Sequence, residues 1–123
     1  MTTNADLKSI HEYLAVPTDW LAARMGVTDQ TVWKYERTSR GDKPLPDYVT
    51  EALAELVHAR EAAEQRAAAI FEGAGRLLPR YESGDQWRVV FPEFEGWPDS
   101  AQGPFVGALS VRLGIGVEFI PAE

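Results

Sequence analysis

Apolar residues recur at helical spacing near the start of the chain. Leu7, Ile10 and Leu14 lie at positions i, i+3 and i+7, which predicts a helix over residues 6–15. Pro17 ends this helix, because proline disfavours helical backbone at the residue before it. The chain is therefore expected to begin with one short amphipathic helix.

Two further helices are indicated by the residues at their ends. Thr18 is a predicted N-cap for a helix over residues 18–25, and Gly26 suits the left-handed position that ends many helices. Thr28 is a second predicted N-cap, for a helix over residues 29–37. Only a very short turn therefore separates these two helices.

One long helix is expected after a polar loop that contains Gly and Pro (residues 38–46). It runs from Asp47 to about Glu72 and ends at Gly73 and Gly75. Its apolar face consists of Val49, Leu53, Leu56 and Val57.

The remainder of the chain mixes strands with a helix. QWRVVF (86–91) predicts a strand closed by Pro92, a turn-rich aromatic and acidic stretch follows, and residues 105–113 predict a helix. VEFI (117–120) predicts a last strand. The expected fold is mainly α (α+β), with a helical domain over residues 1–72 and a small strand–helix–strand region over residues 73–123.

The spacing within residues 18–37 fits a helix-turn-helix, in which two short helices cross steeply and need small or apolar residues at their contact. Ala22 falls at the close-contact position and Gly26 at the turn. The interior positions hold Leu21, Met25, Val27, Val32 and Tyr35. The alternative is an ordinary pair of core helices joined by a glycine turn.

The net charge of −7 at first argues against a nucleic-acid partner, but the charges are unevenly distributed. Residues 1–46 hold six basic and six acidic side chains, whereas the remaining 77 hold six basic and thirteen acidic ones. Residues 30–46 hold four basic and two acidic side chains. The segment after the predicted turn is thus locally basic.

Composition excludes several classes of protein. The chain has no cysteine, which excludes a disulfide scaffold, a cysteine-ligated zinc site and a thiol nucleophile. Its two histidines, His11 and His58, are far apart, so neither a metal nor another cofactor is expected. No apolar run is long enough to span a bilayer and the first residues are polar, so a cytoplasmic location is expected.

The segment GVTDQTVWKYER resembles the Cro and phage-repressor type of helix-turn-helix. The matching residues are Leu21, Ala22, Gly26, Val27, Thr31, Val32, Tyr35 and Glu36. The resemblance covers residues 6 to about 57. Within this family, the order of the parts is similar to the anti-CRISPR-associated autoregulators of phages. The family often pairs an arginine on the first helix with the glutamate that closes the third. Here His11 stands near that place, so the resemblance implies a His11–Glu36 pair.

Once Val32 and Tyr35 face inward, the third helix presents Thr28, Asp29, Gln30, Thr31, Trp33, Lys34 and Arg37 as candidates for DNA contact. Gln30 suits adenine, and Lys34 and Arg37 suit guanine or phosphate. Asp29 either accepts a hydrogen bond from cytosine or only offsets the helix dipole. Trp33 either meets a thymine methyl group or belongs to a packing interface.

Phosphate contacts are expected from positions outside the third helix. Arg40 and Lys43 lie in the loop that follows it, and Thr18 lies at the start of the second helix, whose amides suit an anion. Each basic side chain has the alternative of being an ordinary solvated charge.

A single module reads only a short half-site, so a homodimer on half-sites one helical turn apart is expected. The predicted interface residues in the C-terminal region are Trp87, Val89, Phe91, Phe105, Leu109, Phe119 and Ile120. The alternative is that these side chains pack on the long helix of their own chain.

The sequence therefore favours a non-enzymatic transcriptional regulator, a homodimeric repressor that binds an inverted-repeat operator in double-stranded DNA. An alternative is an antitoxin-like partner protein that uses the apolar, acidic segment from Phe91 to Phe105. An enzyme using Glu93, Glu95 and Asp99 as acid and base is disfavoured, because these carboxylates have no nearby His or Cys in the sequence.

Overall fold

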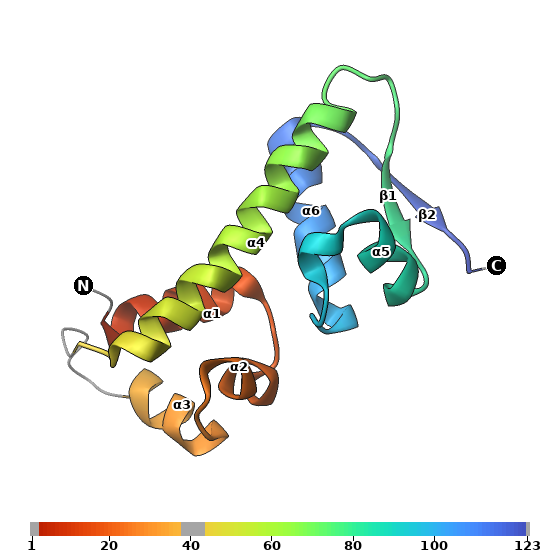
Figure 1. Ribbon diagram of the computed structural model, residues 1–123. Helices are drawn as coiled ribbons and strands as arrows, with labels where there is room; N and C mark the ends of the chain where they lie inside the picture. The colour runs from red at the N-terminus through yellow and green to blue at the C-terminus, as the bar shows by residue number, and fades with distance from the viewer. Residues whose placement is uncertain (1–2, 38–43, 123) are drawn as a thin grey trace. The chain divides into compact units, whose positions relative to one another are not determined.

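The computed structural model describes residues 3–37 and 44–122 and is mainly helical, with one small parallel sheet (Figure 1). The chain divides into two compact units, Met1–His58 and Ala59–Glu123. The expected α+β class is confirmed. The division into these units falls between residues 58 and 59, inside the long helix, whereas the sequence placed the boundary after residue 72.

The first unit contains α1 (Asn4–Leu14), α2 (Thr18–Met25), α3 (Asp29–Glu36) and the start of α4 (Asp47–Phe71). Both α1 and α2 pack on α3. The buried apolar side chains of this unit are Leu7, Leu14, Val16, Leu21, Ala22, Met25, Val32, Leu45, Val49, Leu53 and Leu56. The helical spacing in the sequence therefore identified its core.

A capping box begins α1. The Thr3 side chain accepts from the Asp6 amide, and the Thr3 amide donates to Oδ2 of Asp6 (2.8 Å). Hydrogen bonds from Thr3, first of all the one from its backbone amide, lower the pKa of Asp6. The start of this helix is thus fixed by local contacts.

The second unit contains the end of α4, β1 (Leu78–Tyr81), α5 (Gly84–Val90) and α6 (Gln102–Leu113), followed by β2 (Val117–Ile120). Two short 3₁₀ turns, Pro92–Phe94 and Asp99–Ala101, lie between α5 and α6. β1 and β2 pair in parallel, with Leu78 opposite Val117 and Tyr81 opposite Ile120.

The strand predicted over residues 86–91 is wrong, because this segment belongs to α5. Ser83 caps the helix by accepting from the Gln86 amide (3.4 Å). Gly84, Trp87 and Phe91 are buried at helical spacing, whereas Val89 is 81% exposed. A buried stripe at period 3.6 therefore overrides the preference of neighbouring valines for strands.

The sequence did not predict the strand β1 over Leu78–Tyr81, which contains Pro79. Proline is normally unfavourable within a strand. The backbone amides of Leu78 and Glu82 donate to the carbonyls of Gly116 and Ile120, respectively. The backbone polar groups of alternate β1 residues therefore point toward β2. Pro79 faces the opposite edge of the sheet, where its missing N–H breaks no bond of the ladder.

Aromatic rings form the centre of the second unit. Trp87 and Phe94 stack with centroids 4.4 Å apart, and Phe105 meets Phe94 edge-on at 4.7 Å and Phe91 at 5.3 Å. All four side chains are at most 3% exposed. Trp87, Phe91 and Phe105 therefore pack against other aromatic rings of their own unit.

An ion pair joins α4 to the segment after α5. Nε and Nη2 of Arg66 donate to the two carboxylate oxygens of Glu93 (2.8 and 2.7 Å), and Nη2 also donates to the Val90 carbonyl (2.7 Å). These bonds lower the pKa of Glu93 and raise that of Arg66. The end of α4 is thus fastened within the second unit.

Glu93→Gln is expected to destabilise the second unit by about 1–2 kcal/mol at neutral pH, since Arg66 is 39% exposed and partly screened. Because the pKa of Glu93 is lowered on folding, its contribution is complete above the ordinary carboxyl range. It is lost as the pH falls through the lowered pKa. Urea unfolding between neutral and acidic pH should show wild type and variant converging in acid.

Glu95→Gln is the matched control, because Glu95 is exposed and lies two residues further along the chain. It should leave the acid dependence unchanged. A gap between wild type and Glu93→Gln that stays constant at every pH would contradict the assignment.

No helix within residues 3–37 or 44–122 is both long and apolar enough to cross a membrane.

Candidate nucleic-acid interface

The turn between α2 and α3 is built as the sequence predicts. Gly26 ends α2 with φ 74°, and its amide donates to the carbonyl of Ala23 (3.3 Å). The amide of Val27 donates to the carbonyl of Ala22 (3.0 Å). Together these bonds form a C-terminal helix cap in which Gly26 has the left-handed conformation. This short connection brings α3 back against α2.

The start of α3 is fixed by Thr28, whose Oγ1 accepts from the Thr31 amide (3.2 Å). The Thr31 hydroxyl lies 2.9 Å from the same oxygen. Thr28 is therefore the predicted N-cap, and both threonines are used to begin the helix.

Thr18 is not the N-cap of α2 that the sequence predicted. It is the first residue of α2, whose N-cap is Pro17 without a side-chain cap bond. Oδ1 of Asp19 instead accepts from the Trp20 amide (2.9 Å). This carboxylate occupies part of the helix start where a phosphate was expected.

Buried side chains fix the rotation of α3. Leu21, Ala22, Met25 and Val32 are at most 2% exposed, which agrees with their predicted interior positions. Val27 and Tyr35 are only half-buried. Because Val32 points inward, the residues on either side of it are presented to solvent.

His11 joins three parts of the first unit. Its Nδ1 lies 2.6 Å from Oε1 of Glu36, and its Nε2 lies 2.8 Å from the carbonyl oxygen of Val16. The predicted His11–Glu36 pair is confirmed. The ring also holds the segment after α1, where Ala15 adopts a left-handed conformation (φ 56°).

His11→Ala is expected to lower the free energy of unfolding of the first unit by roughly 1–3 kcal/mol, because a part-buried carboxylate and a carbonyl lose their partner. Thermal unfolding followed by circular dichroism would measure the effect. His58→Ala is the matched control, because His58 is exposed on α4. Equal melting temperatures for the two variants would contradict the assigned role.

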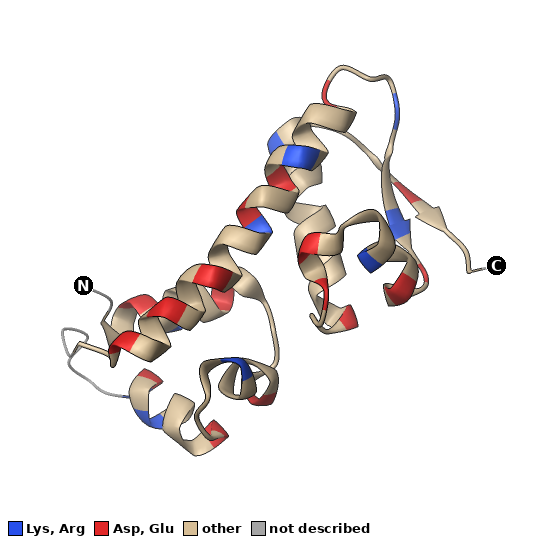
Figure 2. Cartoon of the chain, in the orientation of Figure 1, with Lys and Arg blue, Asp and Glu red and all other residues tan. Residues whose placement is uncertain are grey.

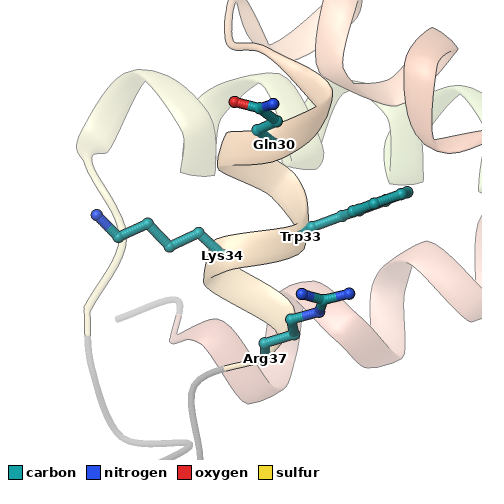
Figure 3. A pocket seen from close by; sticks show the side chains of 4 residues that line it. All are labelled: Gln30, Trp33, Lys34 and Arg37. Carbon is teal, nitrogen blue, oxygen red and sulfur yellow. The ribbon is translucent and has the colours of Figure 1, made fainter.

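The exposed face of α3 gathers four of the predicted contact residues around one open hollow (Figure 3). Its lining residues are Gln30, Trp33, Lys34 and Arg37. In Figure 3, Trp33 and Lys34 extend to opposite sides of the helix, with Gln30 and Arg37 toward its two ends. The face combines an amide, two cations and an aromatic ring.

Trp33 is half exposed, at 50%, although it is one of the largest side chains of the helix. The guanidinium of Arg37 lies over its ring, 5.5 Å from the centroid. This cation–π contact orders two long side chains at the surface.

Lys8 was missed by the sequence analysis. Together with Trp33, Glu36 and Arg37 it lines a second open hollow beside the first. Lys8 precedes His11 by three residues and so shares its face of α1. The predicted His11–Glu36 pair could have indicated this neighbour of α3.

The described part of the first unit is not basic as a whole. The described positions between residues 3 and 58 hold four basic and eight acidic side chains. Figure 2 shows the two signs interspersed on α2 and α3. Asp29 is exposed in the first turn of α3, and Arg40 and Lys43 lie outside the described residues. Binding at this face would therefore depend more on particular contacts than on overall charge.

Among the predicted interface residues, Trp87, Phe91, Phe105 and Leu109 are buried within a single chain and leave no surface for a second copy. Their assignment to an interface is corrected accordingly. Val89 is 81% and Phe119 63% exposed, and Ile120 is half-buried.

Comparisons with known proteins add nothing to this geometry, because neither a protein-family model nor a curated protein matches the chain.

Proposed function

We propose that the first unit is a sequence-specific DNA-binding module and that the protein is a homodimeric transcriptional repressor acting in the cytoplasm. The observation that carries this proposal is the exposed face of α3, where Gln30, Trp33, Lys34 and Arg37 surround one hollow. An α-helix of this kind fits the major groove of B-DNA. The same face is held in place by buried Val32 and by the His11–Glu36 pair.

Each side chain has a chemical role in this proposal. Gln30 pairs with the N6 and N7 atoms of adenine, and Lys34 and Arg37 donate to O6 and N7 of guanine or to phosphate. Trp33 contacts a thymine methyl group and the sugar edge, with its position supported by Arg37. Thr28 and Lys8, at the start of α3 and on α1, contact the backbone of the DNA.

We favour this function over the antitoxin-like alternative, which invoked the apolar, acidic segment from Phe91 to Phe105. The large apolar side chains of that segment, Phe91, Phe94, Trp97 and Phe105, are buried within the second unit. Two of the three carboxylates considered for catalysis, Glu93 and Asp99, pair with Arg66 and Arg88 respectively.

Binding to the DNA immediately upstream of the protein's own start codon tests the proposal. Fluorescence anisotropy should show preference for this DNA over a shuffled sequence of equal composition, with an inverted repeat whose half-sites lie about ten base pairs apart. Because the module has few basic side chains, non-specific binding should be weak and should vanish at modest salt. Equal affinity for both DNAs would refute the proposal.

A further inference from the structure

The two edges of the β1–β2 sheet differ in a way that points to a partner. On the outer edge of β1, Pro79 has no N–H to donate. The backbone N–H and C=O of Tyr81 are both hydrogen-bonded to the side-chain amide of Gln102. The Tyr81 amide donates to Oε1 of Gln102 (2.6 Å), and Nε2 of Gln102 donates to the Tyr81 carbonyl (3.0 Å). Gln102 is 2% exposed. This edge is closed to any further strand.

No side chain within residues 3–37 or 44–122 closes the outer edge of β2 in this way. The carbonyls of Gly116 and Ile120 accept from β1, so the alternation of a parallel ladder turns the backbone groups of Val117 and Phe119 outward. Within residues 44–122 the sheet contains these two strands only. Val117 is 44% and Phe119 63% exposed, although exposed apolar edge strands are usually protected in monomers.

We propose that β2 pairs antiparallel with β2 of a second copy of this chain, with Phe119 opposite Phe119 of the partner copy. The two sheets then form one four-stranded sheet across a two-fold axis. The choice of a second copy rests in part on the proposed function, because an inverted repeat needs two recognition helices. The register comes from the strand itself.

In an antiparallel pair of identical strands, a two-fold axis perpendicular to the sheet passes between two copies of the same residue. The two central residues of β2 are Glu118 and Phe119, so two registers place the axis near the middle of the strand. A pairing centred on Glu118 sets two carboxylates directly opposite at a Cα distance of about 4.5 Å, which is unfavourable. A pairing centred on Phe119 sets two aromatic rings opposite and places Glu118 against Ile120 of the partner copy.

The Phe119-centred register also gives hydrogen-bond partners to backbone groups of Val117 and Phe119 that point away from β1. The two Phe119 residues exchange a pair of hydrogen bonds, and the Val117 amide of each copy donates to the carbonyl of Pro121 in the other. Pro121 has no N–H, so the pairing ends there. The contact area of one strand pair is below the roughly 1,200–2,000 Å² of most stable interfaces, so the dimer should exchange rapidly unless DNA holds it.

Cysteine trapping tests the register, since the natural chain has no cysteine. Phe119→Cys places the thiols of two copies at a Cα separation of about 5.5 Å, within the range that a disulfide spans. Val117→Cys is the matched control on the same face of β2, because Val117 lies opposite Pro121 of the partner copy. Mild oxidation should trap Phe119→Cys as a dimer several-fold faster than Val117→Cys.

A mixture of the two cysteine variants that reacts faster than either alone would show the Glu118-centred register and overturn this one. Equal slow rates for all three samples would overturn the interface itself. Circular dichroism of the reduced variants confirms that both are folded.

Sedimentation supplies a second measurement. Phe119→Lys should raise the dimer dissociation constant at least about tenfold, because like charges then lie opposite. Val111→Lys, which adds the same charge at an 86% exposed valine of α6, should leave it nearly unchanged. Equal dissociation constants for wild type and Phe119→Lys would refute the inference.

The two proposals fail separately. Operator binding by a wild-type protein that forms no Phe119 cross-link leaves the proposed function standing and refutes this interface. A cross-linked dimer without sequence preference for DNA does the opposite.

Discussion

Trp87→Ala is expected to lower the free energy of unfolding of the second unit by about 3–5 kcal/mol. The indole is 0% exposed, stacks on Phe94 at 4.4 Å and lies 6.4 Å from Phe105, so its removal leaves a cavity at the centre of the aromatic cluster. Small domains are stable by only about 5–15 kcal/mol, so much of the total is lost. Urea unfolding followed by circular dichroism would measure the change.

Two control variants separate packing from other effects. Trp87→Phe keeps an aromatic ring and removes Nε1, which has no hydrogen-bond partner among the described residues, so its cost should be much smaller. Val89→Ala, at an 81% exposed position of the same helix, should change stability by less than about 0.5 kcal/mol. The same urea midpoint for Trp87→Ala and Val89→Ala would refute the central place of the indole.

The double variant Lys34→Ala/Arg37→Ala is expected to weaken operator binding at least about thirtyfold. Each base contact contributes roughly 1–3 kcal/mol, and both side chains line the same hollow on α3. Loss of Arg37 also removes the cation over the Trp33 ring. Fluorescence anisotropy with the upstream DNA at constant salt would measure the affinity.

Arg76→Ala/Arg112→Ala is the matched control, because it removes two exposed positive charges from the second unit. It should change affinity by less than about threefold if base contacts, rather than net charge, carry recognition. An equal loss in both double variants would show that Lys34 and Arg37 act only through overall charge.

Local signals in the sequence predicted the first unit closely. Gly26 and Thr28 fix the ends of α2 and α3 through contacts only a few residues away, so neighbouring positions contain the information. The same local reasoning was wrong for Thr18, because Asp19 is the side chain that bonds a backbone amide at the start of α2. Which of two adjacent polar residues takes this role depends on small differences in backbone geometry.

Signals that depend on distant packing failed in the second unit. The valines after Trp87 favoured a strand, but burial of Trp87 and Phe91 at helical spacing produces α5. The strand over Leu78–Tyr81 exists because β2, far along the chain, supplies its hydrogen bonds. Neither the packing that buries Trp87 and Phe91 nor the pairing of β1 with β2 can be predicted from a short window of sequence.

The sequence by itself determined the helices of the first unit and the turn at Gly26, because short-range spacing controls both. The pairing of His11 with Glu36, which lie 25 residues apart, was indicated only by the family resemblance. In the second unit, only the tertiary structure decided which apolar residues are core and which are surface. The sequence gives no sign that Trp87 and Phe119 differ in burial, yet Trp87 is fully buried and Phe119 is 63% exposed. Burial is a property of the whole packed unit, since it depends on which distant segments cover a side chain.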